Sequence, residues 1–388
     1  MNWRLIALAP AMSLFAAQAL AADNLKIGFV VTLSGPAGVI GKHMQDAANL
    51  ALEMLGGKVG NRPAEILFRD DQFKPDVGRQ ESEELLKKDK VDFMSGFIWS
   101  NVLLASYQPI IKSGTILVDA NAGPHEIAGE MCAPNFFSVS WQNDETPEAL
   151  GKFMDDEKMS NVYVMAPNYA AGKDMISGFK RYFHGTIAAE VYTKFGQEDY
   201  QVEISQIRAA NPSAVFVFYP GGMGIQFVKQ YAQSGLREKI PLYSVFTVDE
   251  TTLPALGDAA AGNYEAGIWS ADLKNPRNQE FVAAFRKKFG YMPSFYAAQS
   301  FDAIYLIDSA VKAVKGDLSN KQGMIAAMDK ADFPSVRGPF TYNINHFPIE
   351  NFYLFKIVKD ADGAYIRKVQ STVFTAHKDA YYEECKMK

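Results

Sequence analysis

Two predicted helix starts carry residue types that suit binding of an anion. The first, at 100–101, follows the apolar run 91–96, and the second, at 121–124, follows the apolar run 115–120. The first turn of a helix offers N–H groups without acceptors and partial positive charge, so it can hold a carboxylate without a Lys or Arg. Pro124 suits the first helical position, and the glycine before it allows close approach to the backbone. Ordinary helix capping is the alternative. The candidate ligand-binding residues are Ser100, Asn101, Asn121, Ala122 and Gly123.

Aromatic residues fall near the ends of the same kind of strand. One directly precedes the first helix start, and three lie in loops or at strand ends of the second series of strands and helices, 162–246. Aromatic faces stack well on a planar apolar ligand, and core packing is the alternative for each. The aromatic candidates are Trp99, Tyr169, Tyr219 and Phe246.

Motifs for catalysis and for metal binding are missing from the sequence. The five histidines include no H-E-x-x-H pattern, and none pairs with a cysteine at zinc spacing. There is no G-x-S-x-G elbow. The segment 221–224 follows a strand and is rich in glycine, but it lacks the G-x-G-x-x-G order and is better explained as a tight turn. We therefore expect no catalytic residues, no metal ligands and no cofactor.

Composition and charge narrow the function classes further. The chain has 388 residues, is 48% hydrophobic and 21% charged, and carries a net charge of −5. This composition is that of a globular protein of about two domains, and the acidic balance argues against a nucleic-acid partner. Residues 1–21 read as a secretory signal peptide, with an arginine, an apolar stretch and a small-residue cleavage site ending at Ala21. A buried N-terminal helix is the alternative. We expect a soluble protein exported to a bacterial periplasm.

The two cysteines, Cys132 and Cys385, are too few for a disulfide scaffold or a cysteine-rich zinc site. An oxidising compartment favours a disulfide between them, and two free buried thiols are the alternative.

Strand and helix patterns alternate along most of the chain. Short apolar runs separated by amphipathic stretches occupy 25–120, and a second series runs from 162 to 246. This alternation predicts two doubly wound α/β units with parallel sheets, and ligands of such sheets bind outside the carboxyl ends of the strands. Two further helices, 278–289 and 296–314, precede antiparallel strands at 341–342, 351–358 and 365–372.

Several segments of the chain resemble one known family. Ile27-Gly28-Phe29 and the run 33–38, Leu-Ser-Gly-Pro-Ala-Gly, are similar to the opening of type I periplasmic binding proteins, the leucine/isoleucine/valine-binding family of ABC importers. The segments 231–236 and 257–262 extend the similarity through nearly the whole mature chain. The resemblance implies two Rossmann-like lobes joined by three crossovers, with a cleft that closes on a ligand.

The resemblance also implies the domain boundaries and partners. Lobe I would comprise 22–142 and 271–341, and lobe II would comprise 143–270 and the strands and tail at 342–388. Trp141 and Trp269 would then lie at crossovers. The protein would act as a monomer that delivers a small molecule to a membrane permease.

The resemblance assigns site residues, and it also shows where this sequence departs from the family's ligand-binding pattern. The family's carboxylate-binding serine falls on Ser100, whereas a threonine of the next loop is replaced by Gly123. The family's ammonium-binding glutamate falls on Val245 or Phe246, and neither is acidic. Burying an ammonium without a counter-charge is costly.

The segments 121–124, 140–144 and 166–169 are similar instead to the branch that binds benzoates and hydroxycinnamates. We therefore expect an aromatic carboxylate ligand. A branched-chain amino acid, with Asp249 or Glu250 as the counter-charge, is the first alternative, and an exported enzyme is the second.

Overall fold

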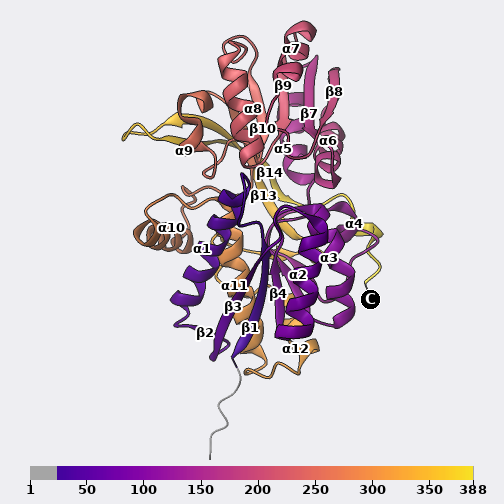
Figure 1. Ribbon diagram of the computed structural model, residues 1–388, viewed down its shortest axis with the longest axis vertical. Coiled ribbons are helices and arrows are strands. Elements are labelled where there is room, and N and C mark those ends of the chain that lie inside the picture. Colours follow the sequence, from indigo (N-terminus) through magenta and orange to yellow (C-terminus); the bar gives the residue numbers. More distant parts are fainter. Residues whose placement is uncertain (1–23, 388) are drawn as a thin grey trace, which may run out of the picture.

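The alternating strand and helix segments form two lobes, one above the other in Figure 1, each built on its own sheet. The protein is described here as a computed structural model that covers residues 24–387. The predicted signal peptide, 1–21, lies outside the described residues.

Lobe I contains a sheet in the order β2-β3-β1-β4-β5-β6, in which every pairing except β2 with β3 is parallel. Helices cover both faces of this sheet (Figure 1). The strands are β1 (Leu25–Val31), β2 (Lys58–Val59), β3 (Arg62–Asp70), β4 (Phe93–Gly96), β5 (Ile116–Asp119) and β6 (Phe136–Ser138). The helices are α1 (Gly38–Met54), α2 (Pro75–Glu84) with a wider turn at Leu85–Asp89, α3 (Ser100–Ser113), α4 (His125–Ala128), α10 (Pro276–Phe289), α11 (Phe295–Ala313) and α12 (Lys321–Met328).

Lobe II contains a sheet in the order β12-β13-β11-β10-β9-β7-β8, with β14 paired to β13. Strands β7 to β11 pair in parallel, and β12, β13 and β14 add antiparallel pairings. The strands are β7 (Val162–Pro167), β8 (Ile187–Thr193), β9 (Ala214–Phe218), β10 (Leu242–Val245), β11 (Tyr264–Gly267), β12 (Thr341–Tyr342), β13 (Pro348–Lys359) and β14 (Tyr365–His377). The helices are α5 (Glu145–Asp156), α6 (Ala170–Tyr182), α7 (Gln201–Ala210), α8 (Gly222–Gln233) and α9 (Leu253–Leu256), with 3₁₀ turns at Gly257–Ala260 and Tyr382–Glu384.

The central strands of both lobes are apolar because they are covered on both faces. Every residue of β9, Ala-Val-Phe-Val-Phe, is buried, as is every residue of β4. A strand that has one face in water would alternate apolar and polar residues instead. The apolar runs of the sequence therefore correspond to central parallel strands, and the two-lobed α/β architecture expected from them is confirmed.

Three connections join the lobes. They comprise residues 139–144 between β6 and α5, residues 268–275 between β11 and α10, and residues 329–340 between α12 and β12. Because the chain crosses three times, α10, α11 and α12 pack in lobe I although they follow the strands of lobe II in the sequence (Figure 1).

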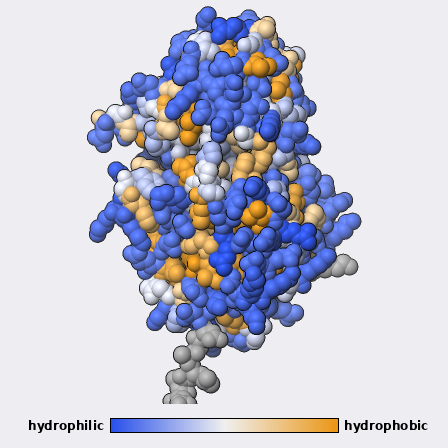
Figure 2. Space-filling view, in the orientation of Figure 1, coloured by the Kyte–Doolittle hydropathy of each residue, from blue (hydrophilic) through white to orange (hydrophobic). Residues whose placement is uncertain are grey.

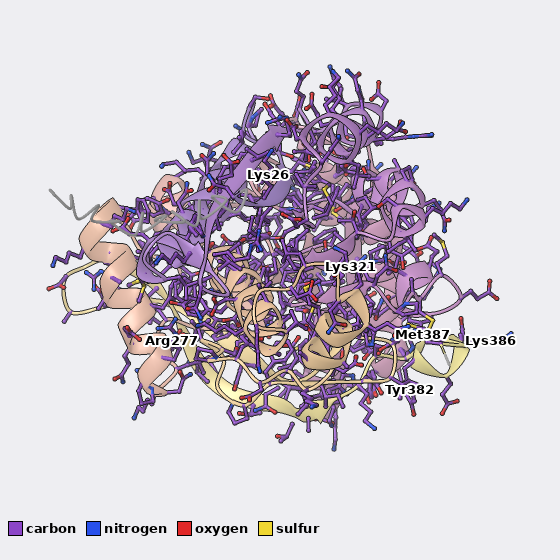
Figure 3. All side chains as sticks on the ribbon, turned by 90° about the horizontal axis from the view of Figure 1, so that it is seen from below. Lys26, Arg277, Lys321, Tyr382, Lys386 and Met387 are labelled. Carbon is purple, nitrogen blue, oxygen red and sulfur yellow. A yellow bond between two sulfur atoms is a disulfide. The ribbon has the colours of Figure 1, made fainter. Side chains whose placement is uncertain are left out.

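The C-terminal segment returns to lobe I after β14. Cys132, which follows α4, and Cys385 are joined in a disulfide across a sequence separation of 253 residues. Figure 3 places Tyr382, Lys386 and Met387 together at one margin of the molecule.

The outer surface shown in Figure 2 is mostly hydrophilic, with smaller apolar patches on both lobes and in the band where the lobes meet. None of the described helices combines the length and the apolar character needed to cross a membrane.

Candidate functional site

A small cavity, in which the centres of water-sized molecules have about 20 Å³ of space, lies between the two lobes. Lobe I supplies part of its wall from the ends of β4 and β5 and from α11, lobe II supplies the facing wall, and the first connection lies between them. The lining residues are Ile98, Trp99, Ser100, Asn121, Ala122, Trp141, Asn143, Tyr169, Ala171, Met175, Phe218, Pro220, Phe246 and Tyr296.

The backbone on both sides of the cavity adopts a conformation that is rare for bulky residues. Phe97 directly follows β4 with φ of 64°, and Phe246 directly follows β10 with φ of 54°. A left-handed conformation at a phenylalanine is costly and persists only where the surrounding structure enforces it.

Ser100 stands at the start of α3, where the sequence predicted an anion site. It is 2% exposed, and its Oγ accepts a hydrogen bond from Asn143 Nδ2 at 3.0 Å. Because that bond uses the oxygen as an acceptor, the Ser100 hydroxyl proton is free to donate to a ligand. The helix has 14 residues, so its first-turn N–H groups add partial positive charge at the same end of the cavity.

The second predicted anion site is built differently from the expectation. The short helix α4 begins at His125 rather than at Pro124 and has only four residues, so it adds little dipole. The backbone N–H groups of 121, 122 and 123 already bind Asp119 Oδ2 at 3.2 Å, Phe97 O at 3.0 Å and Asn143 Oδ1 at 3.2 Å. The expected helix start at Pro124 is therefore wrong, and this loop has no backbone donor left for a carboxylate.

Gly123 allows two segments of backbone to pack closely. A Cβ there would lie 2.1 Å from the carbonyl oxygen of Trp141. The glycine therefore lets the loop of lobe I lie directly on the first connection between the lobes.

Trp99 is fixed at the cavity wall by hydrogen bonds behind it. Its Nε1 donates to Thr32 Oγ1 at 2.7 Å, and the Thr32 hydroxyl donates to Asp71 Oδ1 at 2.5 Å. Burial raises the pKa of Asp71 to about 6. The indole is 1% exposed, and this series of hydrogen bonds holds it against the cavity wall.

Aromatic rings from the two lobes meet beside the cavity. Phe73, in the loop after β3 of lobe I, stacks on Phe195 of lobe II with centroids 4.1 Å apart and planes 20° apart. Trp99 contacts both rings edge-on, at 4.6 and 5.6 Å. The lobes are therefore in contact beside the cavity, as expected for a closed cleft.

The rest of the cavity wall is uncharged and rich in aromatic rings. Trp141 stacks on Phe246 with centroids 4.5 Å apart, and Tyr169 is nearly parallel to Phe218 at 6.2 Å. Burial raises the pKa of Tyr169 and of Tyr296 well above the ordinary value, so both hydroxyls stay neutral. Among the described residues that line the cavity there is no Asp, Glu, Lys, Arg or His.

The cavity contains some of the predicted site residues and not others. Trp99, Ser100, Asn121, Ala122, Tyr169 and Phe246 line it. Asn101, Gly123 and Tyr219 are outside the lining. Tyr219 is packed inside lobe II, where its hydroxyl lies 3.0 Å from Thr193 Oγ1 and its ring contacts Tyr200 and Phe227.

Several lining residues were not predicted as ligand contacts. Trp141 had a signal, since it is a tryptophan at an expected crossover. Asn143 lies in the segment 140–144 that resembles the aromatic-acid-binding branch, and Met175 gave no signal. Tyr296 comes from the start of α11, far from the other lining residues in the sequence. Such a residue reaches the site only through the return of the chain to lobe I.

The two acids considered for an ammonium group are engaged elsewhere. Glu250 accepts two hydrogen bonds from the Arg367 guanidinium, at 2.9 and 2.8 Å. Asp249 Oδ1 accepts hydrogen bonds from the backbone and the hydroxyl of Thr251, at 2.7 and 2.6 Å. Neither acid lines the cavity.

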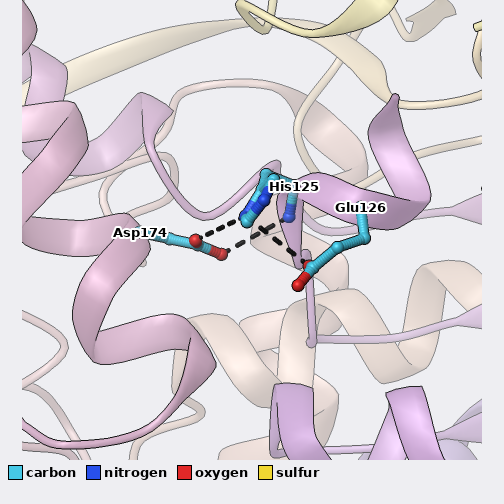
Figure 4. A group of neighbouring side chains, drawn as sticks. All are labelled: His125, Glu126 and Asp174. Carbon is cyan, nitrogen blue, oxygen red and sulfur yellow. Dashed lines mark hydrogen bonds and ion pairs between the residues drawn. The ribbon is translucent and has the colours of Figure 1, made fainter. Parts of the chain in front are cut away.

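One cluster within residues 24–387 has the side chains of a metal site. Ligand atoms of His125, Glu126 and Asp174 all lie within 4.8 Å of one another (Figure 4). His125 Nδ1 is already 2.7 Å from Asp174 Oδ1, and Asp174 Oδ2 accepts a hydrogen bond from Asn143. Because both Asp174 oxygens have partners, the geometry fits an ion pair better than a metal centre.

A larger hollow of about 1010 Å³ opens on the outer surface between α1, α10 and the β13–β14 turn. It corresponds to the notch between the lobes at the left of Figure 2. Its lining includes the charged side chains Lys42, Asp258, Arg286 and Lys359, so it lacks the enclosed apolar character of the ligand cavity.

Comparisons with known proteins agree with this architecture. The chain is 27% identical over 364 residues to the Leu/Ile/Val-binding protein homolog 6 of Brucella melitensis, covering 91% of this chain and 92% of that protein. A solute-binding protein of an ABC transporter from R. palustris, solved in complex with benzoate, has 31% identity and a TM-score of 0.89, covering 94% of this chain and 100% of that one. Another, from Rhodopseudomonas palustris BisB5 in complex with 3,4-dihydroxybenzoic acid, has 29% identity and a TM-score of 0.86, covering 92% and 99%. The family model described as "Periplasmic binding protein" matches residues 24–364, and the chain therefore belongs to the periplasmic binding protein family.

Proposed function

We propose that this protein is the exported solute receptor of an ABC importer, and that it binds a small aromatic carboxylate in the cavity between its lobes. The observation that carries the proposal is the cavity wall, which joins a serine at a helix N-terminus to a set of aromatic rings and holds no charged side chain. A carboxylate and a planar ring match these two parts.

The binding mechanism follows from the positions of the lining residues. The Ser100 hydroxyl and the first N–H groups of α3 would hold the carboxylate, while Trp99, Tyr169, Phe246 and Trp141 would enclose the ring. Asn121 and Ala122 would form the wall beside the carboxylate. We leave Asn101, Gly123 and Tyr219 out of this set because they lie outside the lining. Charge-assisted hydrogen bonds of about 1.5–3 kcal/mol each, with burial of a ring, suffice for micromolar affinity, about −8 kcal/mol.

An amino-acid ligand fits the cavity less well. An α-ammonium in the closed cleft would be buried without a carboxylate, at a cost of roughly several kcal/mol. The curated relatives named for leucine, isoleucine and valine support a branched-chain amino acid as the second candidate. Proteins of this family bind solutes, and we propose that this chain has no enzymatic activity of its own.

Titration calorimetry separates the two candidates. Purified mature protein is titrated with benzoate, 4-hydroxybenzoate, 4-coumarate and leucine. We expect at least one aromatic acid to bind with micromolar or better affinity and leucine to release no measurable heat. Micromolar binding of leucine without any aromatic acid would refute the proposal and would require Asp249 or Glu250 to reach the ligand.

We also propose that the signal peptide 1–21 directs export to the periplasm. Expression of the full chain in a Gram-negative host should give a periplasmic protein whose first residue is Ala22. An uncleaved N-terminus in the cytoplasmic fraction would contradict this.

A further inference from the structure

One ion pair joins the lobes next to the carboxylate end of the cavity. His125 begins α4 in lobe I, and Asp174 lies on α6 in lobe II (Figure 4). His125 Nδ1 lies 2.7 Å from Asp174 Oδ1, and the backbone N–H of His125 donates to Asp174 Oδ2 at 3.4 Å. The side chain of Asp174 is 4% exposed, and that of His125 is 42% exposed. Because the two residues belong to different lobes, opening the cleft would separate them.

A single amide connects this pair to Ser100. Asn143 Nδ2 donates to Asp174 Oδ2 at 2.9 Å and to Ser100 Oγ at 3.0 Å, so both of its N–H hydrogens have acceptors. Asn143 Oδ1 accepts the backbone N–H of Gly123 at 3.2 Å. Every polar atom of the Asn143 side chain is thus bound, and its position depends on Asp174 as well as on Ser100.

We propose that His125 and Asp174 are positioning residues for ligand binding: their ion pair holds the lobes closed and, through Asn143, orients Ser100 toward the ligand carboxylate. The inference rests on the proposed function for its ligand. The pair itself does not contact the cavity, since neither residue is in its lining.

The surroundings of His125 make this pair sensitive to pH. The groups that face it from its neighbouring elements are Asp174 on α6, Glu126 on α4, Asp144 before α5, and the ring of Tyr381 at 5.2 Å. Arg181 is paired with Asp144 at 2.9 Å. The hydrogen bond to Asp174 raises the pKa of His125 to about 9, against desolvation that lowers it.

The direction of the pH effect follows from these groups. In an open cleft His125 loses Asp174, and its pKa returns toward the ordinary value of about 6.5. Closure therefore takes up a proton between these two values. The stabilisation of the closed form is complete below pH of about 6.5 and is lost as the pH rises through about 9. Because His125 is partly exposed, solvent screening reduces the effect, and we expect ligand affinity to fall about tenfold over this range.

Calorimetry with benzoate tests the proposal, because the only titratable group of benzoate is a carboxyl that stays ionised from pH 6.5 to 9. Affinity is measured across this range for the wild type, His125→Gln and Asp174→Asn. A matched control is His184→Gln, since His184 pairs with Asp155 at 3.2 Å within lobe II.

The wild type and His184→Gln should lose about tenfold in affinity as the pH rises. His125→Gln and Asp174→Asn should bind more weakly at pH 6.5, and their affinity should change little with pH. Binding heats measured at pH 8 in buffers of different ionisation enthalpy should show proton uptake in the wild type and none in His125→Gln. An equal pH profile and equal proton uptake in the wild type and His125→Gln would overturn the proposal.

A ligand-free measurement distinguishes this inference from the proposed function. If no aromatic acid binds at any pH, the aromatic-acid function fails, and small-angle scattering then decides the fate of the ion pair. The wild type should become more compact between pH 9 and pH 6.5, whereas His125→Gln should not. Identical radii of gyration at both pH values in the two proteins would overturn the role of the pair.

Discussion

Replacing Ser100 with alanine removes one oxygen from the carboxylate end of the cavity and leaves the aromatic wall in place. In the closed structure that oxygen accepts from Asn143 Nδ2 at 3.0 Å, and its proton is available to the ligand. A hydrogen bond to a charged group contributes about 1.5–3 kcal/mol. The substitution should therefore weaken binding of an aromatic acid by roughly 10- to 150-fold.

The effect on folding should be much smaller than the effect on binding. The free protein loses only the bond between Asn143 and Ser100, about 1 kcal/mol, which for a chain of this size lowers Tm by about 2 °C or less. Calorimetric titration measures the first effect and thermal unfolding the second. Ser95→Ala is a matched control, because Ser95 is a buried serine of β4 whose Oγ donates to Val118 O at 2.7 Å away from the cavity lining.

Both variants should lose a little stability, but the control variant should keep its affinity, whereas Ser100→Ala should lose affinity as well. Unchanged affinity in Ser100→Ala would show that the serine only holds Asn143. An equal loss of affinity in both variants would show that the effect comes from general destabilisation of lobe I, and either result would refute the assignment.

Three other perturbations test separate parts of the structure. The Cys132→Ala/Cys385→Ala double variant opens a loop of 253 residues, and the chain-entropy model sets the loss at about 5 kcal/mol or less; a lower Tm is expected, and two titratable thiols in the exported wild type would contradict the bridge. Burial lowers the pKa of His43 to about 4, below its value of about 6.5 in the unfolded chain, so stability should fall as the pH drops from 6.5 through 4. His43→Phe should flatten that decline in denaturant titrations by up to about 3 kcal/mol, and an equally steep decline in the variant would exclude His43 as its source. Gly123→Ala would place a Cβ 2.1 Å from Trp141 O, so both Tm and affinity should drop, and the free energy of unfolding should fall by about 1–3 kcal/mol. Wild-type Tm and affinity would show that the connection 139–144 can shift to make room for the methyl group.

The order and extent of the main elements could be predicted because they depend on local pattern. Central parallel strands are covered on both faces, so runs such as 214–218 are continuously apolar and stand out from the amphipathic helices around them. The start of α3 at Ser100 was predicted for the same reason, since the polar residue follows such a run by a few positions. Alternation of these patterns was enough to predict two α/β units.

The composition of the cavity was decided by contacts between distant parts of the chain. Tyr296 enters it only because the chain returns to lobe I after lobe II is built, and Asn143 matters because it binds Ser100 and Asp174 at the same time. The loop 121–123 was expected to offer backbone donors, but its N–H groups already donate hydrogen bonds to Asp119, Phe97 and Asn143. No local pattern reports which acceptor a loop N–H will find.

Tyr219 and Phe246 show the boundary between what the sequence determines and what the tertiary structure decides. Each directly follows a central strand of lobe II, and sequence reasoning treated both as candidates for the ligand site. Tyr219 packs among Tyr200 and Phe227 inside the lobe, whereas Phe246 adopts φ of 54° and stacks on Trp141 at the cavity wall. The sequence determines that an aromatic residue stands at the end of a strand. The direction of its ring depends on the path of the following loop, and that path is fixed by contacts with distant residues, such as the bond from Val248 N–H to Glu265 Oε2 at 2.9 Å.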